Sequence, residues 1–399
     1  MNKKLCLILI SICSLSIGSV SAQWIVEQSP SGDNLKAITF TGNNTGWIVG
    51  DNGTILSKKE NQWRNYQTPT TNNLNGIFMI NEREGWAVGD RGTIIHFNGK
   101  SWENIESPVK NNLYSVSFND AENGIAVGAN GVILKYENRR WKSVGRKIQG
   151  NLYTTSLNSD AIWIGGGLEC VNFPLMKIQN DQSGKVANSI KLPATITGLA
   201  MINPEEGWAV GSPSTIMHFD GNNWNKADLD FSYPSLRSVF FSNGNNGITA
   251  GYSGTVLIYS GGNWTFEKTT TGNNLNGTSI AGNSYYAVGD KGTIITKQMD
   301  PVNYSVLRAN PQNKLSNLGI FPNPSDEIIN FSLPLDNNFS TFTASVSSSS
   351  GQVLFQNEFQ SGNGGLPYQI ATKYLSNGLY ILKVNLGTKT YSSKFIIKH

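Results

Sequence analysis

Cysteine is nearly absent from this sequence, which has three cysteines in 399 residues. Cys6 and Cys13 lie in an apolar leader, so Cys170 is left alone and no internal disulfide is expected in the mature chain. Histidine is equally scarce, with three residues, so few candidates exist for a base beside Cys170. We interpret Cys170 as a small buried thiol and not as a nucleophile.

Charge is also sparse, because charged residues make up 15% of the chain and the formal net charge is +4. Lysines and arginines are scattered and do not form the basic stripe of a nucleic-acid-binding protein. No segment shows the 3.6-residue apolar period of a helix. Glycine, in contrast, is abundant, with 42 residues. The composition predicts short strands joined by tight turns, argues against nucleic acid as a partner and gives no support for a role at a membrane surface.

Residues 1–22 contain the long apolar run of the chain. Lys3 and Lys4 precede an apolar stretch that reaches about Val20, and small residues follow up to Ala22. This order predicts a secretory signal peptide with cleavage after Ala22. A transmembrane anchor is the alternative, but serines interrupt the run, which is shorter than the roughly 20 residues that span a bilayer. We expect a mature chain without a transmembrane anchor.

A short motif ending in glycine recurs at intervals of about 40 residues. Its seven glycines are Gly50, Gly89, Gly128, Gly165, Gly211, Gly251 and Gly289. Upstream, each copy opens with Leu or Ile; downstream, five copies place a tryptophan at a fixed distance from the glycine. These tryptophans are Trp63, Trp102, Trp141, Trp224 and Trp264. The constant spacing indicates an internal repeat.

Each copy is predicted to form four short strands. In the second copy they cover Leu74–Ile80, Gly85–Gly89, Thr93–Phe97 and Ser101–Glu106, which are rich in β-branched and aromatic residues and bounded by Asn, Gly or Asp. Four strands in about 40 residues are typical of a propeller blade. We predict an all-β chain whose residues 23–299 form a seven-bladed β-propeller.

The glycine-rich segment Gly89–Thr93, GDRGT, could be a turn or a ligand-binding loop. As a turn, Gly92 takes a positive φ, and Asp90 bonds backbone N–H groups, as do Asp51 and Asp290 in their copies. A phosphate-binding loop would need a helix start and a following Lys-Ser/Thr pair, which the sequence lacks. We interpret the motif as scaffold.

The seventh copy ends without its tryptophan strand. The segment Trp24–Asn34, WIVEQSPSGDN, matches the segments that begin at Trp63 and Trp102. We therefore predict that the mature N-terminus supplies the outer strand of the last blade and closes the ring.

The fourth copy departs from the pattern, because it lacks the tryptophan strand and has extra residues between Trp163 and Ile196. Two interpretations stay open: a degenerate blade, or a blade whose loop is lengthened for binding.

The repeat Gly85–Trp102, GWAVGDRGTIIHFNGKSW, resembles that of the photosystem II stability and assembly factor family of seven-bladed propellers. A more distant likeness is to the bacterial neuraminidase repeat, whose aspartate-box hairpin ends in Gly-x-x-Trp; Phe219–Trp224 is similar to it. The resemblance covers residues 24 to 298. It is specific for architecture and not for activity, because the recurring residues are structural.

An expected linker covers residues 300–317. Residues 318–399 follow, and their motif residues are Pro322, Asn323, Pro324, Gly351, Gly378, Tyr380 and Lys398. Through these residues the segment shows a resemblance to the C-terminal sorting domain of the type IX secretion system of Bacteroidetes. It implies a small β-sandwich, contact with the type IX machinery, transit across the outer membrane, and then removal of the domain with attachment to the cell surface or release. An ordinary C-terminal sandwich that binds another molecule is the alternative.

A catalytic site of the sialidase type would need converging arginines and a nucleophile–acid pair. The propeller arginines lie at different repeat positions, and the carboxylate pairs Glu82/Glu84 and Glu205/Glu206 are interpreted as solvated loop charges. His96 and His218 occupy the same position of blades two and five, on different sides of the ring, and are not expected to share a metal. We predict no catalytic residue, no metal and no cofactor.

One repeat position looks less like scaffold. The residue after each opening Leu or Ile is polar or aromatic and varies, whereas the next residue is small, as suits an innermost strand. This set is Lys36, Asn75, Tyr114, Tyr153, Thr197, Arg237 and Asn276. We predict that these side chains ring one mouth of the central channel and contact an unknown protein or glycan; solvated loop residues are the alternative.

The function expected from the sequence is that of a secreted or cell-surface propeller acting as a non-catalytic binding or assembly scaffold. The alternative is a glycan-binding or glycan-hydrolysing propeller of the sialidase type.

Overall fold

The computed structural model describes residues 23–42, 45–144, 148–158, 161–167, 175–179, 186–190, 192, 194–227, 229–299, 319–321, 325, 328–332, 341–348, 353–360, 368–373, 375–386 and 389–398. The chain divides into two compact units, Met1–Asp300 and Pro301–His399. The expected leader with Ala22, the linker, Cys170, Pro322–Pro324 and Gly351 lie outside the described residues.

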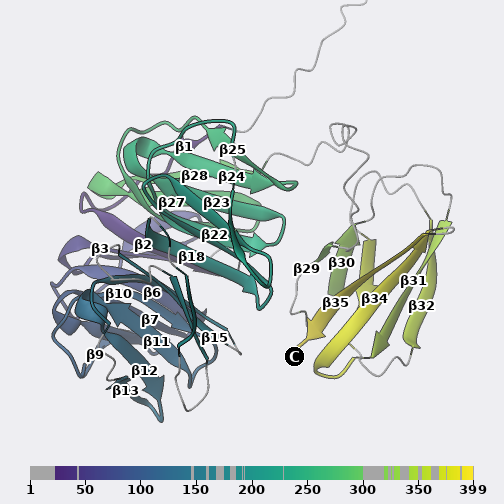
Figure 1. Ribbon diagram of the computed structural model, residues 1–399, viewed down its shortest axis with the longest axis horizontal. Helices are drawn as coiled ribbons and strands as arrows, with labels where there is room; N and C mark the ends of the chain where they lie inside the picture. Colours follow the sequence, from purple (N-terminus) through teal and green to yellow (C-terminus); the bar gives the residue numbers. More distant parts are fainter. Residues whose placement is uncertain are drawn as a thin grey trace, which may run out of the picture. The chain divides into compact units, whose positions relative to one another are not determined.

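In the described part of the first unit the strands form seven four-stranded antiparallel sheets (Figure 1). Blade 1 consists of β2 (Leu35–Thr41), β3 (Thr45–Gly50), β4 (Ile55–Lys59) and β5 (Gln62–Asn65). Blade 2 consists of β6 (Leu74–Asn81), β7 (Glu84–Gly89), β8 (Ile94–Phe97) and β9 (Trp102–Ile105). Blade 3 consists of β10 (Leu113–Phe118), β11 (Gly124–Gly128), β12 (Ile133–Glu137) and β13 (Arg140–Ser143).

The remaining blades repeat this order from inner to outer strand. Blade 4 consists of β14 (Leu152–Leu157), β15 (Ala161–Gly166), β16 (Leu175–Gln179) and β17 (Val186–Ile190). Blade 5 consists of β18 (Thr195–Asn203), β19 (Glu206–Ser212), β20 (Thr215–Phe219) and β21 (Trp224–Lys226). Blade 6 consists of β22 (Leu236–Asn243), β23 (Asn246–Gly251), β24 (Val256–Ser260) and β25 (Asn263–Glu267). Blade 7 consists of β26 (Leu275–Ala281), β27 (Ser284–Gly289), β28 (Ile294–Gln298) and β1 (Ile25–Val26).

The sheets are arranged in a closed ring. The first strands contact one another in the order β2, β6, β10, β14, β18, β22 and β26, and β26 contacts β2 again. The predicted seven-bladed propeller is therefore confirmed. Because every blade places its first strand against those of its two neighbours, the starts of these strands surround the central channel.

The N-terminal strand closes the ring, as predicted. In β1, Ile25 pairs with Thr296 and Val26 pairs with Ile295, both on β28. The backbone N–H of Glu27 extends the ladder by donating to the Ile294 carbonyl at 2.9 Å. Trp24 is buried in the core cluster that blades 6 and 7 share. Blade 7 thus joins the two ends of the repeat region.

Tryptophans fill the spaces between blades. The second-strand tryptophan of one blade meets the outer-strand tryptophan of the next edge to face, with ring centroids 5.6 Å apart for Trp47 and Trp102. The pairs Trp86–Trp141 and Trp208–Trp264 repeat this contact at 5.6 and 5.4 Å. Such pairs add about 0.5–1.5 kcal/mol each beyond the burial of apolar area. The recurring tryptophans are core residues, as the sequence predicted.

The fourth blade is complete but irregular. Leu152 pairs with Gly166, so Gly166 and not Gly165 is the repeat glycine. The sequence assignment was wrong by one residue because three glycines follow Ile164. β17 takes the place of the tryptophan strand and pairs with β16. The blade is therefore degenerate in sequence, while residues 168–174 and 180–185 lie outside the described residues.

The second unit is a small β-sandwich, as predicted. One sheet contains β29 (Gly319–Phe321), β30 (Ile328–Ser332) and β33 (Tyr368–Ala371). The other has the order β32 (Val353–Gln360), β31 (Thr341–Ser348), β34 (Gly378–Leu386) and β35 (Lys389–Ile397). Buried residues of both sheets, including Phe331, Leu382 and Phe395, form one core.

Three sorting-motif residues of this unit are described. Gly378 begins β34, and Tyr380 is buried with its hydroxyl donating to the Ser376 carbonyl at 2.7 Å. The backbone N–H of Lys398 donates to the Ser325 carbonyl at 2.9 Å. These residues thus fix one end of the sheet that carries the C-terminal strand.

Candidate binding face at the mouth of the propeller channel

The glycine-rich motif forms a single-turn 3₁₀ segment between the second and third strands of a blade. In blade 2 this segment is η2 (Asp90–Gly92), where Gly92 has φ +73° and Arg91 has φ 56°. The predicted positive φ at Gly92 is confirmed, and a Cβ at Gly92 would lie 2.0 Å from the Val109 carbonyl oxygen. Only glycine fits both constraints. The motif is therefore a turn packed against the segment that leads into the next blade.

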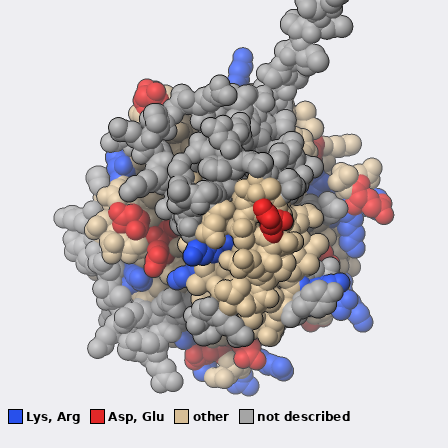
Figure 2. Space-filling view, turned by 90° about the vertical axis from the view of Figure 1, so that its right-hand side faces the viewer, with Lys and Arg blue, Asp and Glu red and all other residues tan. Residues whose placement is uncertain are grey.

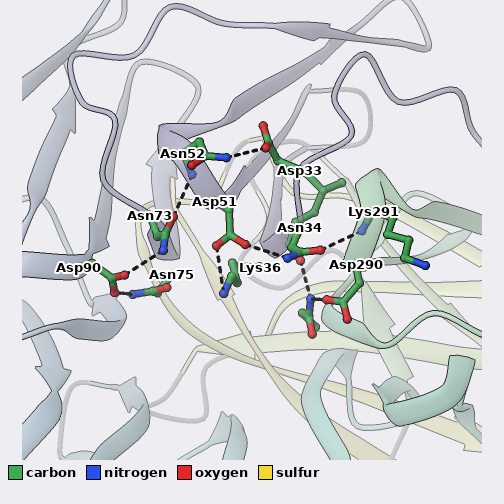
Figure 3. A network of polar contacts seen from close by, with 12 residues as sticks. Asp33, Asn34, Lys36, Asp51, Asn52, Asn73, Asn75, Asp90, Asp290 and Lys291 are labelled. Carbon is green, nitrogen blue, oxygen red and sulfur yellow. Dashed lines mark hydrogen bonds and ion pairs between the residues drawn. The ribbon is translucent and has the colours of Figure 1, made fainter.

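Asparagines link these turns around the ring (Figure 3). Each precedes the opening Leu of a blade, and its side-chain oxygen accepts the N–H of the left-handed turn residue of the previous blade. The Asn52 N–H donates to Asn73, and the Lys291 N–H donates to Asn34, at 2.9 and 3.0 Å. Asn112, Asn151 and Asn274 accept equivalent bonds from Arg91, Asn130 and Ser253. Five junctions between blades share this bond, including the one that closes the ring.

The turn aspartates complete this network. Asn73 donates from Nδ2 to Asp90 at 3.0 Å, and Asn34 does the same to Asp51 at 2.9 Å. Asn274 donates to Asp290 at 2.9 Å. The prediction that these aspartates bond backbone N–H groups of their turns was wrong. Each carboxylate instead accepts a hydrogen bond from the Asn that precedes the inner strand. The two residues lie 16 or 17 positions apart in the sequence.

Three of the seven ring residues belong to the same network. The Nζ of Lys36 lies 3.2 Å from Asp51, and Nδ2 of Asn75 donates to Asp90 at 2.9 Å. Asn276 repeats the Asn75 contact with Asp290 at 2.9 Å. Asn75 and Asn276 also donate to the carbonyl of the opening Leu of the next blade, at 2.9 and 2.8 Å. We call this part of the mouth, formed by blades 7, 1 and 2, the clasp arc.

The other four ring residues lie in a different setting. The rings of Tyr114 and Tyr153 stack with centroids 5.5 Å apart. Thr197 donates to the Leu236 carbonyl at 2.8 Å. Arg237 donates to Asn276 Oδ1, and its guanidinium lies over the ring of Tyr252, 4.3 Å from the centroid. We call the surface formed by these four residues and Tyr252 the aromatic arc.

The two arcs differ at the turn position as well. Blades 7, 1 and 2 carry an aspartate there, whereas blades 3 to 6 carry neutral residues. These residues are Ala129, Gly167, Ser212 and Tyr252. The backbone N–H groups of Ala129, Gly167 and Tyr252 donate to the carbonyl of the residue before the opening Leu of their blade. The N–H groups of Asp51 and Asp90 do the same, so these positions are equivalent. The aromatic arc therefore lacks the turn carboxylates of the clasp arc, one of which pairs with Lys36.

The histidines lie on the third strands, and each carboxylate pair spans the start of a second strand and the turn before it. The ring of His96 packs against that of Trp86, with centroids 4.3 Å apart, and its Nε2 is 3.7 Å from Glu84. Burial lowers the pKa of His96 more than Glu84 raises it. Glu82 is exposed, as predicted. Glu84 is half-buried at the start of β7, where it faces His96, so the interpretation of Glu84 as a loop residue was wrong.

Blade 5 repeats this arrangement. The ring of His218 packs against that of Trp208, with centroids 4.4 Å apart, and its Nε2 is 3.9 Å from Glu206, while Glu205 is exposed. In the residues that the structure describes, no group of three or more His, Cys, Asp or Glu side chains could hold a metal ion. Each histidine thus has its own tryptophan and glutamate.

Sequence reasoning missed two buried lysines beside the closing blade. Lys58 is 4% exposed, and its Nζ contacts both carboxylate oxygens of Glu27 at 2.7 Å. Glu27 also accepts the indole N–H of Trp63 at 2.6 Å. Lys297, 5% exposed, makes the equivalent contact with Glu267 at 2.8 Å. A signal was present: the other blades carry aromatic or aliphatic residues at this third-strand position.

Asp33 connects the N-terminal segment to blade 1. Its carboxylate accepts hydrogen bonds from Thr54, Asn52 and Ser31 at 2.7, 2.8 and 3.0 Å. These bonds hold the pKa of Asp33 below its ordinary value of 3.8. The resulting stabilisation is fully present above that ordinary value and is lost as the pH falls through the lower folded pKa.

Asp33→Asn should therefore destabilise the propeller at pH 7, and its deficit should shrink below about pH 4. The measurement is urea unfolding of both chains between pH 7 and pH 3, followed by tryptophan fluorescence. All ten tryptophans precede residue 300, so this signal reports on the first unit. A deficit that stays constant down to pH 3 would argue against a charged Asp33 in the closure.

Two families match parts of the chain. Residues 319–398 match the family described as secretion system C-terminal sorting domain. Residues 20–137 match the family described as photosynthesis system II assembly factor YCF48. The chain thus resembles YCF48-like propellers and carries a C-terminal segment of the sorting-domain type. A search of curated proteins finds no match.

Solved structures share the fold at low sequence identity. YCF48 bound to D1 peptide is 14% identical, with a TM-score of 0.58, over 70% of this chain and 97% of that one. An inactive virginiamycin B lyase from Staphylococcus aureus, solved with quinupristin, is 13% identical with a TM-score of 0.61, over 70% and 100% of the two chains. PorZ, a surface component of the type IX secretion system of Porphyromonas gingivalis, is 11% identical with a TM-score of 0.53. That match covers 94% of this chain and 60% of PorZ.

Proposed function

We propose that this protein is a surface-delivered propeller that acts as a non-catalytic binding or assembly scaffold, exported by the type IX secretion system through its C-terminal domain. The match of residues 319–398 to a secretion sorting domain carries the export half of the proposal. No helix within the described ranges is long and apolar enough to cross a bilayer. In this proposal, domains run over residues 23–299 and 318–399, with a signal peptide before them and a linker between them.

The scaffold half of the proposal rests on the channel mouth. The recurring motif residues form turns and contacts between blades. The variable ring position is therefore the one that can distinguish one ligand from another. The solved propellers that share the fold include an assembly factor with a bound peptide, which supports a binding role. Figure 2 shows Lys and Arg interspersed with Asp and Glu among the described residues of the side drawn there.

Deletion of residues 318–399 tests the export half. We expect the truncated chain to stay in the periplasm, whereas the intact chain reaches the surface or the medium. Fractionation followed by immunodetection measures this. Equal surface delivery of the truncated chain would contradict the export assignment.

An activity test separates the scaffold from the glycan-hydrolysing alternative. The chain from Gln23 to His399 is incubated with sialosides and polysaccharides, and it is also cross-linked on the native cell surface. We expect no turnover and one reproducible surface partner. Turnover would overturn the scaffold assignment.

A further inference from the structure

We infer that the aromatic arc is a binding site for an acidic saccharide, with Arg237 contacting a carboxylate and the Tyr114–Tyr153 pair stacking on a sugar ring. The inference rests on the proposed binding function and names the ligand class of that site. It assigns no chemistry, since binding alone is proposed.

Arg237 is a charged residue among neutral neighbours. Its contacts within the described chain are the amide oxygen of Asn276 and the face of Tyr252, both neutral. Lys36, at the same position in blade 1, pairs with Asp51 at 3.2 Å. No carboxylate in the described residues lies within ion-pair distance of Arg237. A partly buried guanidinium with neutral neighbours favours an anion from outside, and a planar fork matches a carboxylate.

Two neighbours orient the guanidinium of Arg237. Asn276 holds one end of the fork, and Asn276 is itself fixed by Asp290 and the Leu35 carbonyl at 2.9 and 2.8 Å. The guanidinium carbon lies 4.3 Å from the centroid of the Tyr252 ring. These contacts restrain the group before any ligand arrives. Preorganisation of this kind reduces the entropy lost on binding.

The aromatic arc also holds a pair of tyrosines. Tyr114 and Tyr153 are half-buried and stack with an interplanar angle of 29°. Stacked aromatic side chains with a polar rim suit the apolar face of a pyranose ring as well as its hydroxyl groups. A single ring position, that of Thr197, separates Tyr153 from Arg237 around the mouth. The site is therefore suited to a short oligosaccharide that carries a carboxylate at one end.

The test uses the chain from Gln23 to His399 and three ligands: a galacturonic acid trisaccharide, its methyl ester, and a short peptide with a free C-terminal carboxylate. Calorimetry measures binding to the chain and to three variants, Arg237→Gln, Tyr153→Leu and Arg64→Gln. Arg237→Gln keeps a hydrogen-bond donor for Asn276 but removes the charge. Arg64→Gln makes the same replacement at an exposed position of the outer strand β5, outside the ring, and is the matched control.

We expect the acidic trisaccharide to bind at least tenfold more tightly than its methyl ester. Arg237→Gln should remove that preference, Tyr153→Leu should weaken the binding of both saccharides, and Arg64→Gln should change the binding of neither. Equal binding of acid and ester, or an equal loss in Arg64→Gln, would overturn the site. Tighter binding of the peptide would overturn the saccharide as ligand. If no saccharide binds but a partner is still cross-linked at the cell surface, the inference fails while the scaffold function stands.

Discussion

Removal of Trp24–Asp33 should lower the melting temperature of the propeller by about 10–20 °C. The deletion takes away β1, which leaves β28 as an unprotected edge, and it removes Trp24 from the core of blades 6 and 7. Loss of a buried tryptophan alone costs about 3–5 kcal/mol. Lys58 also loses Glu27. Thermal unfolding followed by tryptophan fluorescence gives the shift for the first unit.

The matched control for this deletion is Ile25→Thr/Val26→Thr. Both side chains are exposed, at 60% and 62%, and threonine keeps the strand propensity. The control should melt within a few degrees of the intact chain. If the truncated chain does not fold, Trp24→Ala gives the same direction with a smaller effect. A melting temperature that the deletion leaves unchanged would show that the ring does not depend on its N-terminal strand.

Replacement of Lys58 by methionine should destabilise the propeller by about 3 kcal/mol, because it leaves Glu27 in the junction without its cation. Lys58 also lies over the rings of Tyr286 and Trp63, at 4.7 and 5.4 Å, so its charge contributes beyond the ion pair. Chemical unfolding monitored by tryptophan fluorescence measures the loss. Lys59→Met is the control, since Lys59 is the next residue of β4 and is exposed.

The double variant Glu27→Tyr/Lys58→Phe extends this test. It copies the residues of the next junction, where Tyr66 and Phe97 pack with centroids 6.0 Å apart. Because an apolar pair of similar volume replaces a buried ion pair at little cost, the double variant should recover most of the stability. A double variant as unstable as Lys58→Met would mean that the ion pair does more than fill and neutralise the junction.

The sequence predicts most of the fold, because the repeat spacing indicates each blade and the displaced tryptophan segment at Trp24 indicates how the ring closes. In blade 2, most of the strand ends differ from the predicted ones by one residue. Local signals of this kind depend on residues close in the chain. Gly166 was missed for the same reason: three successive glycines satisfy the local pattern in more than one register, and only the pairing with Leu152 selects one.

The repeat position that forms the candidate site was predictable from the sequence. The division of the mouth into a clasp arc and an aromatic arc was not. The ring residues share one repeat position, which the sequence shows directly. Their partners come from other repeats: Asn75 reaches Leu113, and Asn276 reaches Leu35 across the closure. Those contacts depend on the order of blades in space, so the sequence could not separate the clasp arc from the aromatic arc. The buried ion pairs of Lys58 and Lys297 were missed because each partner lies on a neighbouring blade.

Hydrogen exchange of β28 tests the closed ring most directly. In the chain from Gln23 to His399, the amides of Ile294 and Thr296, which face the N-terminal segment and not β27, are measured by mass spectrometry beside the equivalent amides of the third strand β24. A ring latched by its own N-terminus predicts equal slow exchange in the two strands, and rapid exchange in β28 alone after deletion of Trp24–Asp33. Fast exchange of β28 in the intact chain would contradict the closure on which the whole account depends.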